Sequence, residues 1–99
     1  MEGSLREDPW KEKLHRLIQD FVAREGGIEA VYLFGSRAWG RAGYASDFDL
    51  AVKGEKRRIR ELSEYLEEST FPFEVEVIPW NELPEDWREK IEREGERWI

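Results

Sequence analysis

The sequence predicts a small domain of the α/β (α+β) class, in which one mixed sheet has its helices packed on one face. Three observations predict this class. Three segments show the period of an amphipathic helix, three shorter segments are rich in β-forming residues, and the two kinds alternate along much of the chain. The 99 residues form a single predicted domain, 1–99, with an N-terminal helix over 1–27 and a core over 28–99.

The helices are predicted from capping residues and apolar stripes. The first begins after Asp8 as N-cap and ends before Gly26-Gly27. The second covers 55–68, and the third begins near residue 84. Their core-facing side chains are Trp10, Leu14, Leu17, Ile18, Phe21 and Val22 in the first helix, Ile59, Leu62, Tyr65 and Leu66 in the second, and Leu83, Trp87 and Ile91 in the third.

The predicted strands cover 28–34, 47–52 and 73–78. The first is short, apolar and bounded by glycines, which is typical of a buried strand. The other two alternate between apolar and polar residues, so each presents an apolar face and a second face that carries acids. Between the first two strands, 35–46 contains three glycines and is predicted to be a loop with at most one helical turn.

The composition disfavours several kinds of site. Asp and Glu number 23 against 16 Lys and Arg, and the resulting net charge of −7 disfavours broad nucleic-acid binding. No cysteine is present, so disulfides and thiolate metal sites are excluded, and the one histidine, His15, is predicted to be a half-exposed helix residue. No run approaches the ~20 apolar residues of a membrane span, so the expected location is the cytoplasm.

The acids of the second and third strands form a candidate metal site. Asp47 and Asp49 are two residues apart on a strand and therefore project to the same side. If the third strand lies beside them, Glu76 or Glu74 comes within ~5 Å of an aspartate. Such like charges repel one another unless a cation binds, and ligands that are all oxygen select Mg²⁺, Mn²⁺ or Ca²⁺. The alternative is a solvated strand face whose charges prevent edge aggregation.

Gly35 and Ser36 directly follow the first strand and form a candidate phosphate site. Glycine allows the backbone to approach a phosphate, and Ser36 offers a hydroxyl beside the free N–H groups of a helix start. Taken alone, Gly-Ser is also an ordinary turn and N-cap. Its spacing of ten residues from the acid pair, on strand, turn and strand, favours a functional site.

The segment from Gly35-Ser36-Arg37-Ala38-Trp39-Gly40 through Ser46-Asp47-Phe48-Asp49 resembles the signature of the minimal nucleotidyltransferases, in the polymerase-β-like nucleotidyltransferase superfamily. The resemblance implies that 28–99 is a catalytic core of that fold. It also implies that Gly35 and Ser36 hold the triphosphate. Arg37 and Arg41 are candidates to hold phosphate oxygens, and the alternative is that they are solvent-exposed loop charges. By the same resemblance, Asp47 and Asp49 bind two Mg²⁺ ions, for which Mn²⁺ can substitute. Glu76 is the third catalytic and metal-binding carboxylate, with Glu74 as the alternative.

The resemblance also implies a biological role. Such proteins are antitoxins that pair with a helical HEPN-domain toxin and transfer AMP from ATP to a tyrosine of that partner. One alternative is a non-catalytic antitoxin that neutralises its partner by docking, since Glu replaces the more common Asp at 76 and aromatic residues such as Trp39 and Trp80 are available for contacts. Nucleotidylation of a small molecule is a third alternative. The five tryptophans are compatible with an apolar contact surface for an oligomer.

Overall fold

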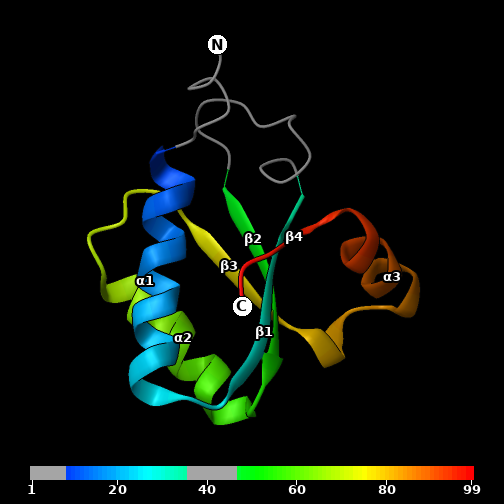
Figure 1. Ribbon diagram of the computed structural model, residues 1–99, viewed down its shortest axis with the longest axis horizontal. Coiled ribbons are helices and arrows are strands. Elements are labelled where there is room, and N and C mark those ends of the chain that lie inside the picture. The colour runs from blue at the N-terminus through cyan, green and yellow to red at the C-terminus, as the bar shows by residue number, and fades with distance from the viewer. Residues whose placement is uncertain (1–8, 36–46) are drawn as a thin grey trace.

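The computed structural model describes residues 9–35 and 47–99, and it confirms an α/β domain built on one mixed sheet (Figure 1). The strand order is β3-β2-β1-β4, where the strands are β1 (Ile28–Phe34), β2 (Phe48–Gly54), β3 (Val75–Pro79) and β4 (Glu96–Arg97). β2 runs antiparallel to β1 and parallel to β3, and β4 pairs antiparallel with the other side of β1. β4 has no counterpart among the predicted strands, because a strand of two residues shows no alternation.

The three helices lie close to their predicted positions: α1 (Pro9–Glu25), α2 (Lys56–Glu68) and α3 (Glu85–Glu94). The N-cap expected at residue 8 falls outside the described residues. α2 connects β2 to β3, as a parallel pair of strands requires a crossover segment between them. None of these helices is long and apolar enough to cross a bilayer.

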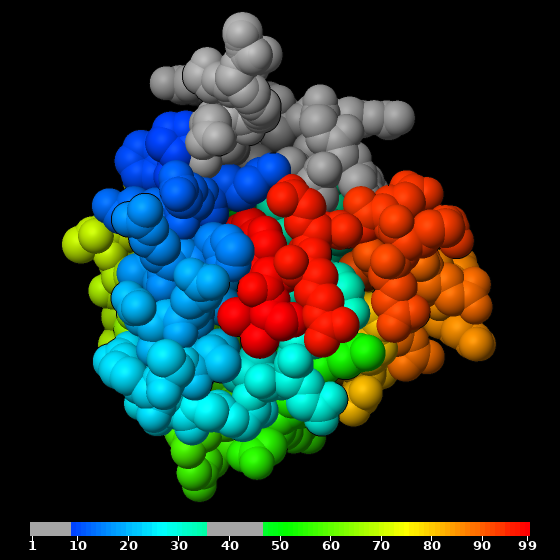
Figure 2. Space-filling model, viewed as in Figure 1, coloured from blue at the N-terminus to red at the C-terminus, as the bar shows by residue number. Residues whose placement is uncertain are grey.

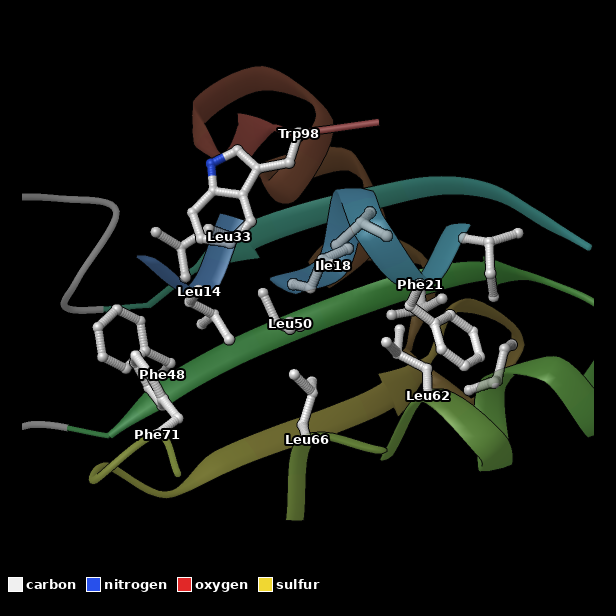
Figure 3. Close-up of a cluster of buried hydrophobic side chains, with 14 residues drawn as sticks. Leu14, Ile18, Phe21, Leu33, Phe48, Leu50, Leu62, Leu66, Phe71 and Trp98 are labelled. Atoms are coloured by element: carbon white, nitrogen blue, oxygen red, sulfur yellow. The ribbon is translucent and has the colours of Figure 1, made fainter. Parts of the chain in front are cut away.

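The main core lies between one face of the sheet and helices α1 and α2 (Figure 3). Because side chains alternate along a strand, β2 sends Phe48, Leu50 and Val52 to this face, and all three are fully buried. α1 and α2 contribute the predicted apolar stripes. Their buried members are Leu14, Ile18, Phe21, Ile59, Leu62 and Leu66.

A second, smaller core lies on the opposite face, and it corrects the expectation that all helices share one face. α1 and α2 do share a face, but α3 packs on the other side of the sheet (Figure 1), where Ile91 is fully buried against Tyr32 and Ala51. The reason lies in β1, whose residues from Ala30 to Phe34 are all buried, so its second face also needs an apolar cover. Trp87, expected in the core, is 42% exposed at the edge of this cluster.

The C-terminal residues contact β1 and α1 and so hold β4 in place. In Figure 2 they lie between α1, in blue, and α3, in orange. The backbone N–H of Trp98 donates to the carbonyl of Val31 at 2.8 Å, and the Trp98 ring stacks on His15 at 4.7 Å between centroids. Lys11 and Glu96 form an ion pair at 2.6 Å. His15 is thus a half-buried packing residue on a helix, as its sequence context predicts.

Candidate functional site

The predicted acids lie at one end of the sheet face that α3 partly covers. Asp49 is the register partner of Glu76 on β3 and of Phe34 on β1. All three side chains share a face with the second core, because they are two residues from Ala51, Ile78 and Tyr32 respectively. Asp47 is exposed just before β2 and alternates to the same side. The face therefore carries a row formed by Phe34, Asp49 and Glu76, with Asp47 next to it.

Gly35 touches the acid at the centre of this row. Its φ angle is +83°, a conformation that side chains other than glycine's rarely adopt. A Cβ added at Gly35 would lie 2.7 Å from Oδ2 of Asp49, so any larger residue would displace the carboxylate. Both the positive φ angle and the close approach of Asp49 favour glycine at this position. The structure brings together Gly35 and Asp49, which the sequence analysis assigned to the phosphate site and the metal site.

The pKa of Asp49 reflects its burial and the two acids beside it. Partial burial is the largest effect that raises the pKa of Asp49 above its ordinary value, and the negative charges of Glu76 and Asp47 raise it further. The carboxylate of Asp49 is therefore less stable in its charged form than a solvent-exposed aspartate. A cation at this point would remove that cost, since it attracts all three charges.

The donors present suit a hard cation that the substrate helps to hold. In residues 9–35 and 47–99, no three acidic or histidine side chains are gathered closely enough to hold an ion by themselves. Mg²⁺ commonly binds through one or two carboxylates, while water and substrate phosphates supply the remaining ligands. The half-buried Asp49, with the exposed Asp47 and Glu76 beside it, fits this open type of site and not a closed protein cage.

Two glutamates of the third strand segment were candidates for the third carboxylate. Glu76 lies directly opposite Asp49, and its charge contributes to the raised pKa of that residue. Glu74 precedes β3, and its backbone carbonyl accepts a hydrogen bond of 3.0 Å from the N–H of Phe48. The register thus favours Glu76 over Glu74 as the neighbour of Asp49.

Four residues singled out in the loop lie outside the described residues: Ser36, Arg37, Trp39 and Arg41. No aromatic residue was predicted on the acidic face. Phe34 stands next to Asp49 there, and the ring of Trp87 from α3 lies 6.1 Å from the ring of Phe34. The alternation Ala30, Tyr32, Phe34 could have indicated an apolar second face, and thus a helix that covers it.

A cavity of about 200 Å³ lies elsewhere in the molecule. Its lining includes Glu29, Lys53 and Trp80, and it is therefore at the end of the sheet where Ile28 pairs with Gly54. Asp49 is at the opposite end of β2. The cavity is therefore separate from Asp49 and from its neighbours Asp47 and Glu76.

Comparison with known proteins identifies the family of the chain. Residues 16–98 match the family model described as polymerase beta, nucleotidyltransferase. The chain belongs to this nucleotidyltransferase family. A relative from Haemophilus influenzae, described as a probable protein adenylyltransferase MntA, is 35% identical over 85 residues. That match covers 81% of this nucleotidyltransferase and 67% of the relative.

Solved structures share the fold of this nucleotidyltransferase. A crystal structure of a toxin–antitoxin with AMP-PNP matches with a TM-score of 0.66 and 20% identity, over 86% of this chain and 72% of that one. A tri-AMPylated Shewanella oneidensis HEPN toxin in complex with its MNT antitoxin matches with a TM-score of 0.58 and 20% identity, over 91% and 69% of the two chains. At this level of identity the likeness shows a common fold.

Proposed function

We propose that this nucleotidyltransferase transfers AMP from ATP to a tyrosine hydroxyl of a helical HEPN-domain toxin, and so acts as an antitoxin in the cytoplasm. The observation that carries the proposal is the convergence on Asp49, which has Gly35 against its carboxylate and Glu76 opposite it. The relative described as a protein adenylyltransferase, and the related folds found in toxin–antitoxin complexes, support the choice of a protein acceptor.

The described residues of the site, Gly35, Asp47, Asp49 and Glu76, have roles that their positions support. Asp47 and Asp49 hold Mg²⁺, with two ions expected from the family signature. Gly35 allows the triphosphate to approach the backbone at the end of β1, and Ser36 and Arg37 contribute further contacts to the nucleotide. Glu76 lies across the row from β1, where the acceptor hydroxyl approaches, and it accepts the proton of that hydroxyl.

The reaction is an in-line displacement at the α-phosphorus of ATP. The tyrosine oxygen forms a bond to this phosphorus, the bond to the bridging oxygen of the β-phosphate breaks, and pyrophosphate leaves. When bound, Mg²⁺ neutralises phosphate charge in such transfers. The protein's contribution is to position the groups and to complement their charge, which is the main demand of phosphoryl transfer.

The test is transfer of label from ATP labelled in the α-phosphate to the co-purified partner in the presence of Mg²⁺. We expect the wild type to label the partner, and Asp49→Asn to lower the rate by on the order of 10³-fold. Glu74→Gln is the matched control, because it removes one acid from the same strand segment without touching Asp49, and it should keep most of the activity. A wild type that leaves an active toxin unlabelled would contradict the proposal.

Docking without catalysis is the second candidate function. Two tryptophans, Trp10 and Trp87, are 38% and 42% exposed and provide apolar contact surface. The deciding experiment compares toxin neutralisation by wild type and by Asp49→Asn at equal dose. Equal neutralisation would mean that binding alone suffices, whereas loss of neutralisation by a variant that still binds the toxin would exclude docking as the mechanism.

A further inference from the structure

An exposed indole stands beside the acidic row. Among the described residues, the large apolar side chains that are more than a third exposed are those of Trp10 and Trp87. Trp10 packs on Phe71 and Phe73, so it belongs to the face of the sheet that α1 and α2 cover. Trp87, 42% exposed, contacts Phe34 and so lies on the face that carries the acids. The two residues are alike in type and exposure but lie on opposite sides of the sheet.

The position of Trp87 relative to Asp49 follows from two contacts. The ring of Trp87 lies 6.1 Å from the ring of Phe34 at an interplanar angle of 63°, and Phe34 is the register partner of Asp49. The indole is therefore separated from Asp49 by one side chain, that of Phe34. The two rings meet edge to face, so Phe34 does not stack on Trp87, and the ammonium group of Lys90 lies over the Trp87 ring at 6.0 Å from its centroid. A stacked base would therefore use the face of the indole opposite Lys90. A ribose and a phosphate can bridge the separation between the indole and Asp49.

We propose that Trp87 is the platform on which the base of the nucleotide stacks, an inference that rests on the proposed function. A stacked base over Trp87 leaves the ribose above Phe34 and the α-phosphate near Asp49. An indole offers a large flat face to any nucleobase, and base–aromatic stacking is a general source of affinity for nucleotides. This role also explains why a residue with the helical spacing of a core position remains half exposed.

The position of Trp87 in relation to the acidic row indicates that its ligand is the nucleotide and not the acceptor. Trp87 contacts β1, the strand that Gly35 follows, where the triphosphate is expected. The attacking oxygen must approach the α-phosphorus opposite the departing pyrophosphate, which is the side of Glu76 and β3. An acceptor side chain therefore arrives at the end of the row that is farther from Trp87.

The test measures binding of two ligands by calorimetry in the presence of Mg²⁺: ATP, and inorganic tripolyphosphate, which has no base. We expect Trp87→Ala to weaken ATP binding by about tenfold and to leave tripolyphosphate binding unchanged. Trp87→Phe, which keeps a ring, should retain most of the affinity for ATP. Trp10→Ala is the matched control, since it removes a similarly exposed tryptophan from the opposite face, and it should change neither ligand.

Three results would overturn the proposal, and they can be told apart. Unchanged ATP binding by Trp87→Ala would refute the role of Trp87 while the proposed function stands. Equal weakening of both ligands would show that Trp87 only supports the packing of Phe34. A wild type that binds neither ATP nor tripolyphosphate would refute the proposed function as well.

Discussion

The two faces of β2 differ in what they do, although they belong to the same seven residues. On one face Phe48, Leu50 and Val52 are fully buried under α1 and α2. On the other, Asp49 is half-buried between Phe34 and Glu76, and α3 covers only part of the surface. The strand period of two allows a single segment to supply both the core and the site. Stability and function should therefore respond to different substitutions along this strand.

The largest expected effect on stability comes from the buried face. Leu50→Ala should lower the free energy of unfolding by about 2–5 kcal/mol, because it removes a fully buried side chain and leaves a cavity. Asp49→Ala, at the adjacent position on the other face, should cause no comparable loss. Urea unfolding of both variants measures the contrast. If Asp49→Ala destabilises the protein as much as Leu50→Ala, the two faces do not differ as described.

Gly35→Ala tests the contact between the turn and the acid. It should cost about 1–2 kcal/mol for the positive φ angle, and more because the new Cβ collides with Oδ2 of Asp49. Gly26→Ala is the control. Gly26 has a φ angle of +69° but nothing within 4 Å of an added Cβ, so the loss of unfolding free energy in this variant comes from the backbone conformation alone. Unfolding free energies that fall equally in the two variants would contradict the contact.

Asp49→Asn should stabilise the protein without ligands at neutral pH. The folded state raises the pKa of Asp49 above 3.8, so the ionised carboxylate destabilises the fold. That penalty is fully present above the folded-state pKa and disappears as the pH falls below the unfolded-state value. The difference in unfolding free energy between variant and wild type should therefore be largest at neutral pH and vanish in acid. A difference that grows in acid would contradict this account.

The smallest effect distinguishes the two glutamates. Glu76→Gln should lower the pKa of Asp49 towards its ordinary value, because of the two neighbouring charges that of Glu76 raises this pKa more. Glu74→Gln should leave that pKa almost unchanged. A carbon-detected NMR titration of the Asp49 carboxyl group measures both. An equal decrease in the two variants would mean that Glu74 is as close to Asp49 as Glu76 is.

Much of this arrangement could be predicted from the sequence. Alternation along 47–52 and 73–78 predicted which side chains share a face, and the register then brought Asp49 opposite Glu76. The apolar stripes of the first two helices predicted the main core for the same reason: each depends on a period within one continuous segment. The glycine after β1 was predicted to allow close approach, and the structure adds that Asp49 is what approaches it in the protein itself.

Features that depend on several segments could not be predicted in this way. α3 has an apolar stripe, but the period of this stripe does not indicate on which face of the sheet the helix packs. The half exposure of Trp87 and its contact with Phe34 follow from that choice. β4 is held in place by its pairing with Tyr32 and Leu33 of β1. The contacts of the next residue, Trp98, with Val31 and His15 also hold it. No local preference of its two residues predicts a strand.

The measurement that tests the central claim most directly is the melting temperature of the protein with Mg²⁺ and ATP. A ligand at a hundredfold excess over its Kd stabilises the folded state by about 2.7 kcal/mol, which for a domain of this size corresponds to a rise of roughly ten degrees or more. We predict such a rise for wild type and for Glu74→Gln, and none for Asp47→Asn. A wild-type melting curve that stays unchanged over millimolar Mg²⁺ and ATP would contradict the account of the acidic face as a nucleotide site.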